Sequence, residues 1–312
     1  MSKTPKDDEA LTDTTPDQPA LVKSYLSRSN ESGVTLPMTP PGDRYTLVEA
    51  LASGTSGVVW LAHDRLMSRE VAIKVLHSEL QSSQNLKSRF LYEAKLTARL
   101  GHPGVVPVFD LGHLADGRCY FAMERIEGDD LKTHLENLRT GDRTADQRMS
   151  LTRLLQTVSR VAMTVAYAHN QGYLHRDLKP ANILIGEYGE VFVADWGLAK
   201  PFDESVLDWS DTYRGESTQT GTVLGTIRYM SPEQVKGEVN RLTPASDVFS
   251  LGVILYECLS LTTPFKNRSA YALMMEVIST QATSPETAFT GQSVPQELQE
   301  LVNAALSLEP AE

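Results

Sequence analysis

The chain concentrates its chemically capable side chains in one short segment, residues 174–185, and in the few residues that follow. Asp177, Lys179 and Asn182 stand close together there between apolar neighbours, and Asp195 comes after a further apolar run. Polar groups in such surroundings are costly unless each has an assigned partner. The spacing therefore predicts a site that combines two carboxylates, an amine and an amide.

A glycine-containing turn precedes this segment in the chain. Residues 45–48 and 58–62 have the composition of strands, and Gly54 and Gly57 lie between them. A strand, a glycine turn and a second strand predict a hairpin. Glycines allow the main chain to approach a ligand and to direct amide groups at it, so the turn is either a cover for a phosphate or simply a tight turn.

Lys74 and Glu93 form the next candidate pair. Residues 71–75 alternate as a strand, and Lys74 shares one face of it with a small apolar residue. Residues 85–100 have a helical periodicity that places Glu93 on the same stripe as Phe90. A carboxylate on a buried stripe needs a cation, and Lys74 is an available candidate. We therefore expect a Lys74–Glu93 ion pair, with a solvated lysine and a surface carboxylate as the alternatives.

Composition and charge restrict the class of protein. The chain has 312 residues, of which 41% are hydrophobic and 22% are charged, as in soluble globular proteins with room for two lobes. The net charge of -11 argues against nucleic acid or an anionic membrane surface as the main partner, because such surfaces attract basic proteins. An anionic ligand must then be held by local groups.

Cysteine usage and hydropathy bear on the compartment. Cys119 and Cys258 lie in apolar runs, so we expect buried free thiols rather than a disulfide or a metal pair. No run approaches the roughly 18 apolar residues of a transmembrane helix, and the N-terminus lacks the apolar core of a signal peptide. These features predict a soluble, cytoplasmic protein with no membrane segment in this chain.

The rest of the chain divides into a tail and a structured region. Residues 1–42 are rich in Ser, Thr, Pro, Asp and Lys, and we expect a disordered N-terminal tail because they cannot bury enough apolar surface to offset the entropy of ordering. Residues 198–230 are polar and predict a long surface loop. Further expected elements are strands over residues 105–111 and 119–123, a core helix over 151–170 and an apolar helix over 247–261.

In this order the features resemble the protein-kinase superfamily. The motifs that carry the resemblance are Ala72-Ile73-Lys74, Glu93, His175-Arg176-Asp177 with Asn182, Asp195-Trp196-Gly197 and Ser231-Pro232-Glu233. The resemblance implies an α+β, two-lobed protein-kinase-like fold, with a small β-rich N-lobe that has one helix and a larger, mainly α C-lobe. It places the N-lobe at residues 43–123, the hinge at 124–128 and the C-lobe at 129–312.

The resemblance also implies roles for the polar cluster. By analogy with the family, Asp177 would accept the proton of the attacking hydroxyl, and Lys179 would steady the γ-phosphate of ATP. Asn182 and Asp195 would hold Mg²⁺, or Mn²⁺ in its place, since hard oxygen ligands suit these ions. The alternative for Asp177 is a structural or capping aspartate.

A nucleotide site is implied as well. Lys74, held in place by Glu93, would contact the α- and β-phosphates, and Val59, Ala72 and Leu184 would enclose the adenine ring. The remaining residues that the resemblance assigns to the nucleotide are the phosphate-covering turn (Ala52, Ser53, Gly54, Thr55, Ser56 and Gly57), Met123 as the gatekeeper residue, and the main chain of Glu124 and Ile126.

The substrate class follows from two features. Lys179, two residues after Asp177, and the Gly225-Thr226 segment resemble the Ser/Thr-specific form of the family, in which Thr226 would contact Asp177. The resemblance is to bacterial kinases of eukaryotic type, and it implies protein substrates with Ser/Thr acceptors and a kinase–kinase dimer for trans-phosphorylation. Two alternatives are an ATP-binding pseudokinase or signalling scaffold, and a small-molecule kinase, which the Ser231-Pro232-Glu233 motif disfavours.

Arg176 suggests a form of regulation. The family pattern implies that this arginine helps to bind a phosphorylated loop residue, for which Thr218, Thr220 and Thr222 are the candidates. Phosphothreonine adds about -1.5 to -2 charge and can make one to three charge-assisted hydrogen bonds. These bonds cannot order a long loop by themselves, so the phosphate would shift a near-balanced equilibrium between conformations of the loop.

Three positions depart from the family pattern. Ala52 replaces the first loop glycine, and Trp196 replaces the usual phenylalanine, so that a larger ring must stack against His175. The sequence stops at Glu312, before the arginine that in the family pairs with the residue at Glu233 and before a final helix. We therefore expect a C-lobe truncated before its last helix, a Glu233 without its partner, and any membrane anchor outside this chain.

Overall fold

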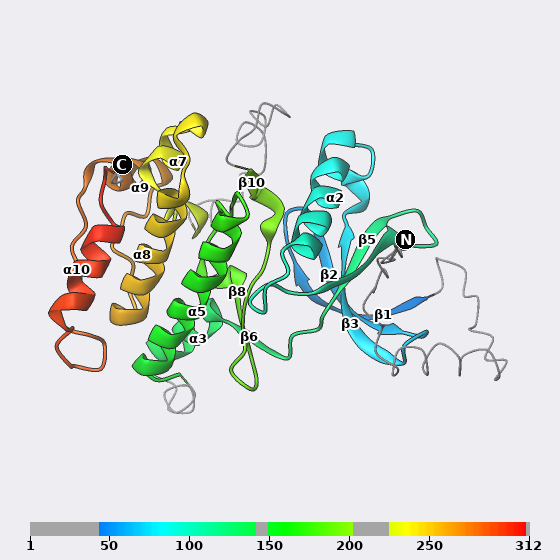
Figure 1. Ribbon diagram of the computed structural model, residues 1–312, viewed down its shortest axis with the longest axis horizontal. Helices are drawn as coiled ribbons and strands as arrows, with labels where there is room; N and C mark the ends of the chain where they lie inside the picture. The colour runs from blue at the N-terminus through cyan, green and yellow to red at the C-terminus, as the bar shows by residue number, and fades with distance from the viewer. Residues whose placement is uncertain (1–43, 142–148, 202–224, 310–312) are drawn as a thin grey trace, which may run out of the picture. The chain divides into compact units, whose positions relative to one another are not determined.

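The computed structural model describes residues 44–141, 149–201 and 225–309. The tail predicted for residues 1–42 lies outside these ranges, so its disorder stays a prediction. Within the described part, an N-terminal lobe of strands precedes a C-terminal lobe of helices, as Figure 1 shows. This is the α+β, two-lobed arrangement that the order of motifs predicted.

A five-stranded antiparallel sheet forms the N-terminal lobe, with the strand order β1-β2-β3-β5-β4. Its strands are β1 (Tyr45–Ser53), β2 (Gly57–Asp64), β3 (Arg69–Leu76), β4 (Val108–His113) and β5 (Cys119–Met123). The hairpin predicted around Gly54 and Gly57 is the β1–β2 connection. Strand β3 lies at the centre of the sheet, and its residues from Val71 onward are all buried.

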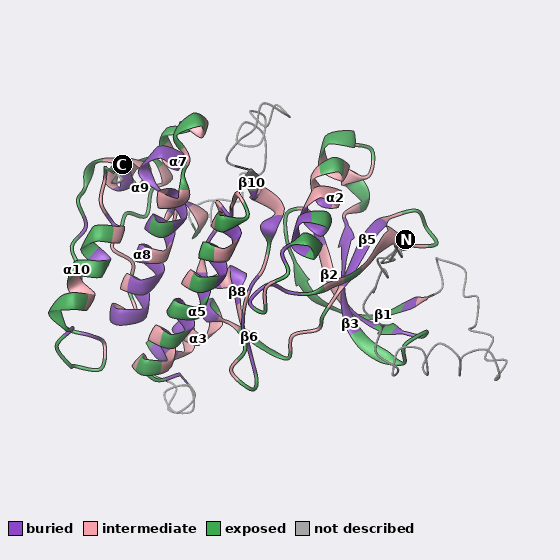
Figure 2. Cartoon of the chain, in the orientation of Figure 1, coloured by how far each residue is buried: buried purple, intermediate pink, exposed green. Residues whose placement is uncertain are grey.

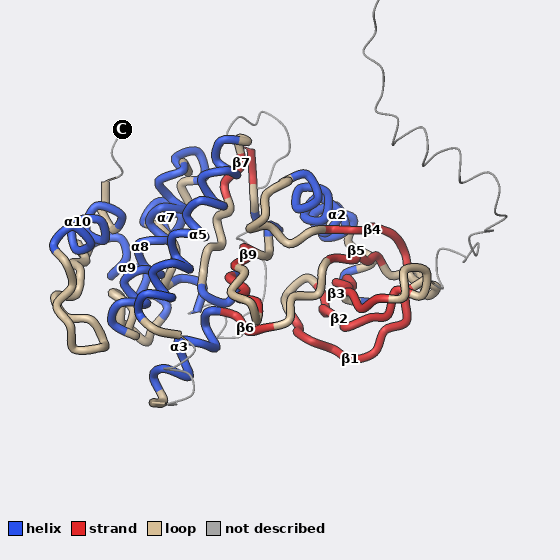
Figure 3. Tube along the Cα trace, turned by 60° about the horizontal axis from the view of Figure 1, so that its bottom comes forward, coloured by secondary structure: helices blue, strands red, loops and turns tan. Residues whose placement is uncertain are grey.

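One α-helix, α2 (Gln84–Arg99), packs against this sheet (Figure 3). The side chain of Ser83 caps the helix by accepting a hydrogen bond from the N–H of Leu86, which satisfies one of the free amides of the first turn. Phe90 on the buried stripe lies with its ring 5.2 Å from that of Phe121 on β5. The same stripe turns Glu93 toward the sheet.

The C-terminal lobe is mainly helical (Figures 1 and 3). Its helices are α3 (Leu131–Arg139), α5 (Leu151–Asn170), α7 (Pro232–Lys236), α8 (Pro244–Ser260), α9 (Ala270–Ser279) and α10 (Gln296–Ala305). Short strands lie on the side of this lobe that is nearer to the N-terminal sheet. One small sheet consists of β6 (Gly128–Asp130), β8 (Ile183–Gly186) and β9 (Val191–Val193), and another of β7 (Tyr173–Leu174) and β10 (Lys200–Pro201).

Helix α8 is the core of the C-terminal lobe, and Figure 2 shows it largely buried. It packs against α5 on one side and α10 on the other. Gly252 permits the close approach to α10, because a Cβ there would lie 2.8 Å from the Cβ of Ala305. Two carboxylates, Asp247 and Glu257, are nonetheless buried in this apolar helix.

The sequence predicted most of these elements. The helix expected over residues 151–170 is α5, and both cysteines are buried and free, as expected. The strand expected over residues 105–111 was placed too early: β4 begins at Val108, while Val105 makes an isolated bridge to Val193 in the other lobe. Among the described residues, no helix is both long enough and apolar enough to span a membrane.

A buried carboxylate ties the start of β1 to the β2–β3 turn. Asp64, at the end of β2, is fully buried and accepts two hydrogen bonds from the Arg44 guanidinium, of 3.0 and 2.8 Å. It also accepts bonds from the main-chain N–H groups of Leu66 and Met67 in the β2–β3 turn. These bonds, with that to Arg44 foremost, lower the pKa of Asp64. The ionised form of Asp64 therefore stabilises the folded state of the chain.

We expect Asp64→Asn to lower the free energy of unfolding at pH 7 by about 1.5–3 kcal/mol, the usual range for hydrogen bonds to charged groups. Asparagine keeps one acceptor oxygen for the turn amides, but it loses the charge and the second oxygen that accepts from Arg44. Because the folded-state pKa lies below the unfolded value, the difference from wild type should be constant at neutral pH and shrink as the pH falls below about 4. Urea unfolding across this pH range measures it.

Asp116→Asn is the matched control, because Asp116 also pairs with an arginine, Arg118, but in an exposed turn. Exposed pairs contribute little, so the control should differ from wild type much less at every pH. A difference for Asp64→Asn that is as large at pH 3 as at pH 7 would contradict the assignment.

Candidate active site

The site begins with an ion pair that joins the sheet to α2. Lys74 on β3 donates to Glu93 of α2 over 2.6 Å, and its Nζ lies 3.6 Å from Oδ1 of Asp195. Burial acts to lower the pKa of Lys74, but the carboxylates of Glu93 and Asp195 outweigh it and raise the pKa. Lys74 therefore stays cationic. The predicted Lys74–Glu93 pair is confirmed.

Trp196 fits beneath α2. Its side chain is fully buried, its ring centroid lies 4.6 Å from that of His175, and its Nε1–H donates to the carbonyl of Val193 over 3.1 Å. A buried tryptophan needs such an acceptor. Asp195 before it has a left-handed backbone (φ 62°), which turns its carboxylate toward Lys74. The larger ring is accommodated with its polar atom bonded.

Asp177 lies at the centre of a second cluster. Its Oδ2 accepts hydrogen bonds from Lys179 Nζ at 2.7 Å and from Asn182 Nδ2 at 3.2 Å. Asn182 also donates to the main-chain carbonyl of Asp177 at 2.8 Å. Burial raises the pKa of Asp177, and the Lys179 ammonium offsets this only in part. The side chains that the sequence placed close together do meet, in bonds that fix the carboxylate.

Asn182 and Asp195 fit a hard divalent cation. Because the amide nitrogen of Asn182 is engaged with Asp177, its carbonyl oxygen remains as an acceptor. The side chain of Asp195 is 46% exposed, and Lys74 lowers its pKa, so an ionised carboxylate faces open space. In the described part of the chain no three His, Cys, Asp or Glu side chains gather as a complete metal site. Two oxygen ligands suit Mg²⁺, which retains water and takes phosphate oxygens as further ligands.

Asp247, which the sequence analysis did not single out, fixes the backbone of residues 175–182, the segment that the resemblance makes the catalytic loop. Its carboxylate accepts bonds of 2.8 Å from the N–H groups of both His175 and Arg176, and it lies 2.7 Å from His169 Nε2. Arg176 has a positive φ of 69°, and its carbonyl accepts a bond of 2.7 Å from Gln234. The available signal was a carboxylate near the start of a strongly apolar helix.

The residues assigned to the nucleotide come from both lobes. Ala72 and Met123 are direct partners across β3 and β5, and Val59 is the partner of Lys74 across β2 and β3. Leu184 lies on β8 in the C-terminal lobe. The N–H of Glu124 donates to the carbonyl of Pro107, which holds the connector between the lobes.

The glycine turn has a specific steric requirement. Ala52 and Ser53 end β1, residues 54–56 turn, and Gly57 begins β2. A Cβ on Gly57 would lie 2.2 Å from the carbonyl oxygen of Val75, so only glycine fits. Ala52 pairs with Val59 within the sheet, where an alanine is tolerated.

Comparison with known proteins agrees with this geometry. The family model described as the protein kinase domain matches residues 45–312. The chain belongs to the protein kinase family. Membership confirms the predicted fold class, and it implies use of ATP and a divalent metal ion.

The relatives are bacterial. Serine/threonine-protein kinase PknD of Protochlamydia amoebophila is 36% identical over 294 residues, which cover 91% of this chain and 29% of the relative. The proteins of the same name from Chlamydia felis and Chlamydia trachomatis (serovar D) are 37% and 33% identical, over 86% of this chain and 29% or 30% of the relative. The predicted resemblance to bacterial Ser/Thr kinases is confirmed, and the kinase chain spans about three tenths of these relatives.

Two expectations for the C-lobe of the kinase have different outcomes. Glu233 was expected to lack the arginine partner of the family pattern; it is buried, and Ser246 Oγ donates to its Oε1 over 2.5 Å, so the carboxylate accepts a bond from a neutral group. Of the regulatory candidates, Thr218, Thr220 and Thr222 lie outside the described residues. Thr226 lies within the described residues. The Asp177 carboxylate accepts hydrogen bonds from Lys179 and Asn182, so the contact between Asp177 and Thr226 stays a prediction.

His77 is a second residue that the sequence analysis missed. It follows β3, and its main-chain N–H donates to the carbonyl of Ser56 over 3.2 Å. Its ring Nε2 lies 2.9 Å from the carbonyl oxygen of Gly54. A carbonyl only accepts, so Nε2 must carry the proton. His77 thus ties two residues of the glycine turn to the end of β3, and no sequence pattern marks such a contact.

We expect His77→Asn to raise the KM for ATP about twofold to tenfold, the effect of one lost hydrogen bond on a ligand-covering loop. His77→Gln should stay close to wild type, because a glutamine Nε2 lies as many bonds from Cα as the histidine Nε2 and can still donate. Steady-state kinetics with ATP varied will separate KM from kcat.

His63→Asn, on the exposed face of neighbouring β2, is the control for removing an N-lobe histidine. If the Gln and Asn variants at position 77 were equally impaired, or both unchanged, the bond to Gly54 would have no role in holding the turn.

Proposed function

We propose that this chain transfers the γ-phosphate of ATP to Ser and Thr hydroxyls of proteins. The observation that carries the proposal is the simultaneous assembly of two clusters, Lys74 with Glu93 and Asp195, and Asp177 with Lys179. Phosphoryl transfer needs positioning and neutralisation of phosphate charge, and these two clusters supply the groups for both. The names of the bacterial relatives support the same activity.

The residues divide the work as follows. Asp177 accepts the proton of the acceptor hydroxyl, and its bonds to Lys179 and Asn182 keep the carboxylate aimed. Lys179 also steadies the transferring phosphate. Lys74 binds the α- and β-phosphates, and the glycine turn, tied down by His77, covers them. The adenine ring lies between the lobes against Val59, Ala72 and Leu184, with the main chain of Glu124 and Ile126 at its edge.

We assign the metal to Mg²⁺, with Mn²⁺ as a substitute, held by Asn182 and Asp195. When bound, the ion supplies charge neutralisation at the phosphate oxygens. We further assign residues 43–123, 124–128 and 129–312 to N-lobe, hinge and C-lobe, and we place the chain in the cytoplasm. In a pseudokinase or scaffold, a catalytic group would be missing. The described site contains the groups that the proposed reaction needs, which supports an active enzyme instead.

Asp177→Asn should reduce phosphate transfer from Mg-ATP to a generic basic protein by about 10²- to 10⁴-fold, the contribution of a general base. Asparagine keeps the size and can accept the bond from Lys179, so the KM for ATP should change little. Mass-detected phosphate on Ser and Thr of the acceptor measures the result. A variant as active as wild type would remove the enzyme assignment.

The regulatory proposal concerns the segment after β10. We propose that a second copy of the chain phosphorylates Thr218, Thr220 or Thr222 and that Arg176 helps to bind the phosphate. Support comes from the place of Arg176, whose main chain is held at the catalytic loop by Asp247 and Gln234. A charge-assisted bond contributes about 1.5–3 kcal/mol, enough to shift a balanced equilibrium but not to order the whole segment.

Incubation of the chain with Mg-ATP should therefore add phosphate to one or more of these threonines, at a rate that rises with protein concentration. Mass mapping locates the sites, and the Asp177→Asn protein incubated alone is the control, which should stay unmodified. A fully active preparation in which all three threonines carry no phosphate would contradict the proposal.

A further inference from the structure

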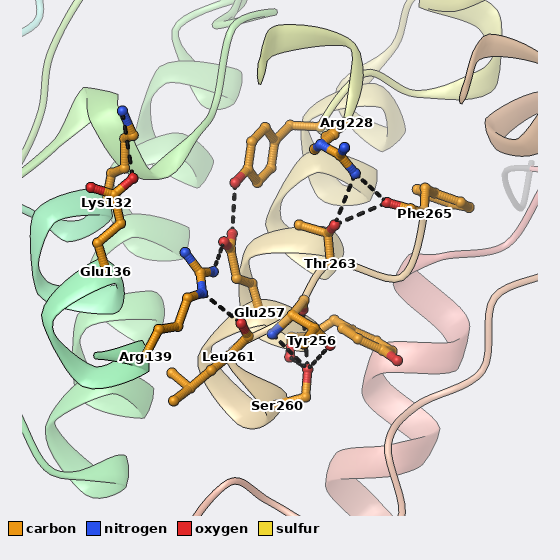
Figure 4. Close-up of polar contacts among 12 residues, drawn as sticks. Lys132, Glu136, Arg139, Arg228, Tyr256, Glu257, Ser260, Leu261, Thr263 and Phe265 are labelled. Carbon is orange, nitrogen blue, oxygen red and sulfur yellow. Dashed lines mark hydrogen bonds and ion pairs between the residues drawn. The ribbon is translucent and has the colours of Figure 1, made fainter. Parts of the chain in front are cut away.

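A cavity of about 630 Å³ lies beside Lys179 in the C-terminal lobe. Its wall includes Lys132, Glu136 and Arg139 of α3, Arg228, and Glu257 of α8, which Figure 4 shows as sticks. Lys179 contacts the Asp177 carboxylate, so the cavity adjoins the place where an acceptor hydroxyl must lie. A side chain near that hydroxyl in a substrate protein can reach the cavity.

The carboxylate at the base of the cavity is already occupied. Glu257 is only 5% exposed, and it accepts hydrogen bonds from the Arg139 guanidinium and, over 2.7 Å, from the Tyr229 hydroxyl. Arg139 also donates to the carbonyl of Leu261 over 2.6 Å, which fixes its orientation (Figure 4). A basic side chain that enters the cavity would have to displace Arg139 to reach Glu257.

The other charged groups favour an anion. The Arg228 guanidinium donates to the carbonyls of Phe265 and Asn267 and to the Thr263 hydroxyl, which are all uncharged partners. Its positive charge is therefore not cancelled by a direct ion pair among the described residues. The side chain of Lys132 is 58% exposed, and its Nζ lies 3.7 Å from Oε1 of Glu136. This distance is long for an ion pair, so the ammonium can turn toward a ligand.

Four cations thus line the cavity against two carboxylates, and the excess is one positive charge when Asp177, which pairs with Lys179, is included, on a chain whose net charge is -11. Local potential, rather than net charge, decides which ligand such a cavity accepts. Building on the kinase function proposed above, we propose that the cavity receives an acidic side chain of the substrate protein close to the phosphorylated Ser or Thr. Arg139 is the specificity-determining residue, because it covers Glu257 and presents a positive charge instead.

The test uses synthetic peptides with one Ser acceptor in a neutral background. Each flanking position in turn carries Glu, its uncharged isostere Gln, or Arg, and kcat/KM is measured for every peptide at constant ionic strength. For wild type, Glu at the responsive position should exceed Gln by about fivefold or more, as expected for a charge-assisted contact in a partly exposed site, and Arg should be the poorest.

Two variants locate the preference. Lys132→Gln removes an exposed charge and should reduce the preference for Glu over Gln at least twofold without affecting the Gln peptide. Arg139→Met uncovers Glu257 and should reverse the order, so that the Arg peptide becomes better than the Glu peptide. Lys95→Gln, on the exposed face of α2, is the control for a lost lysine and should behave as wild type.

The outcomes separate this inference from the proposed activity. Transfer to no peptide at all would contradict the kinase function itself. Transfer that ignores flanking charge, a wild-type preference for Arg, or a Glu preference that both cavity variants retain would overturn the assignment of the cavity while leaving the activity intact. If Arg139→Met does not fold, the Lys132→Gln comparison alone decides.

Discussion

The carboxylate of Asp247, fully buried at the start of α8, accepts hydrogen bonds from two consecutive main-chain N–H groups of the catalytic loop. One of those residues, Arg176, has a left-handed backbone, a conformation that costs a non-glycine residue about 1–3 kcal/mol. Two charge-assisted bonds in a dry interior offset that cost and hold the loop in one shape. The orientation of the Asp177 carboxylate therefore depends on Asp247, which lies outside the cluster of Asp177, Lys179 and Asn182. Helix α8 thus acts as a rigid support for the site.

Helix α8 has a second buried carboxylate, Glu257, and the two together connect the loop that carries Asp177 with the cavity beside it. Asp247 holds the catalytic loop from one end of the helix, and Glu257 organises Arg139 and Tyr229 around the neighbouring cavity from the other. Neither carboxylate is free to act on a ligand. Because each is buried and satisfied within the protein, both serve to position other groups, which explains why an apolar core helix tolerates two acids.

Sequence reasoning predicted the parts of the site that depend on local period and spacing. The alternation of β3 and the buried stripe of α2 were enough to pair Lys74 with Glu93, and the short spacing from Asp177 to Asn182 was enough to predict a polar site, although the bond between these two side chains was not foreseen. It missed Asp247, His77 and the Arg139–Glu257 pair. Asp247 acts on residues about 70 positions earlier and Glu257 on one 118 positions earlier, so only the packing of helices and loops brings them together. It also did not foresee the hydrogen bond that Glu233 accepts from Ser246 at the start of α8.

The charge balance of the reacting groups gives a reason for the metal ion. Lys74 and Lys179 are the ammonium groups of the two clusters, and they face three carboxylates, those of Glu93, Asp195 and Asp177. The site as built from side chains is therefore net negative, on a chain that is itself acidic. A polyphosphate brought to such a site is repelled unless a further cation arrives with it. Asp195, whose pKa Lys74 lowers, remains ionised, so under the proposed assignment of the metal to Asp195 the binding of metal and of nucleotide would be coupled.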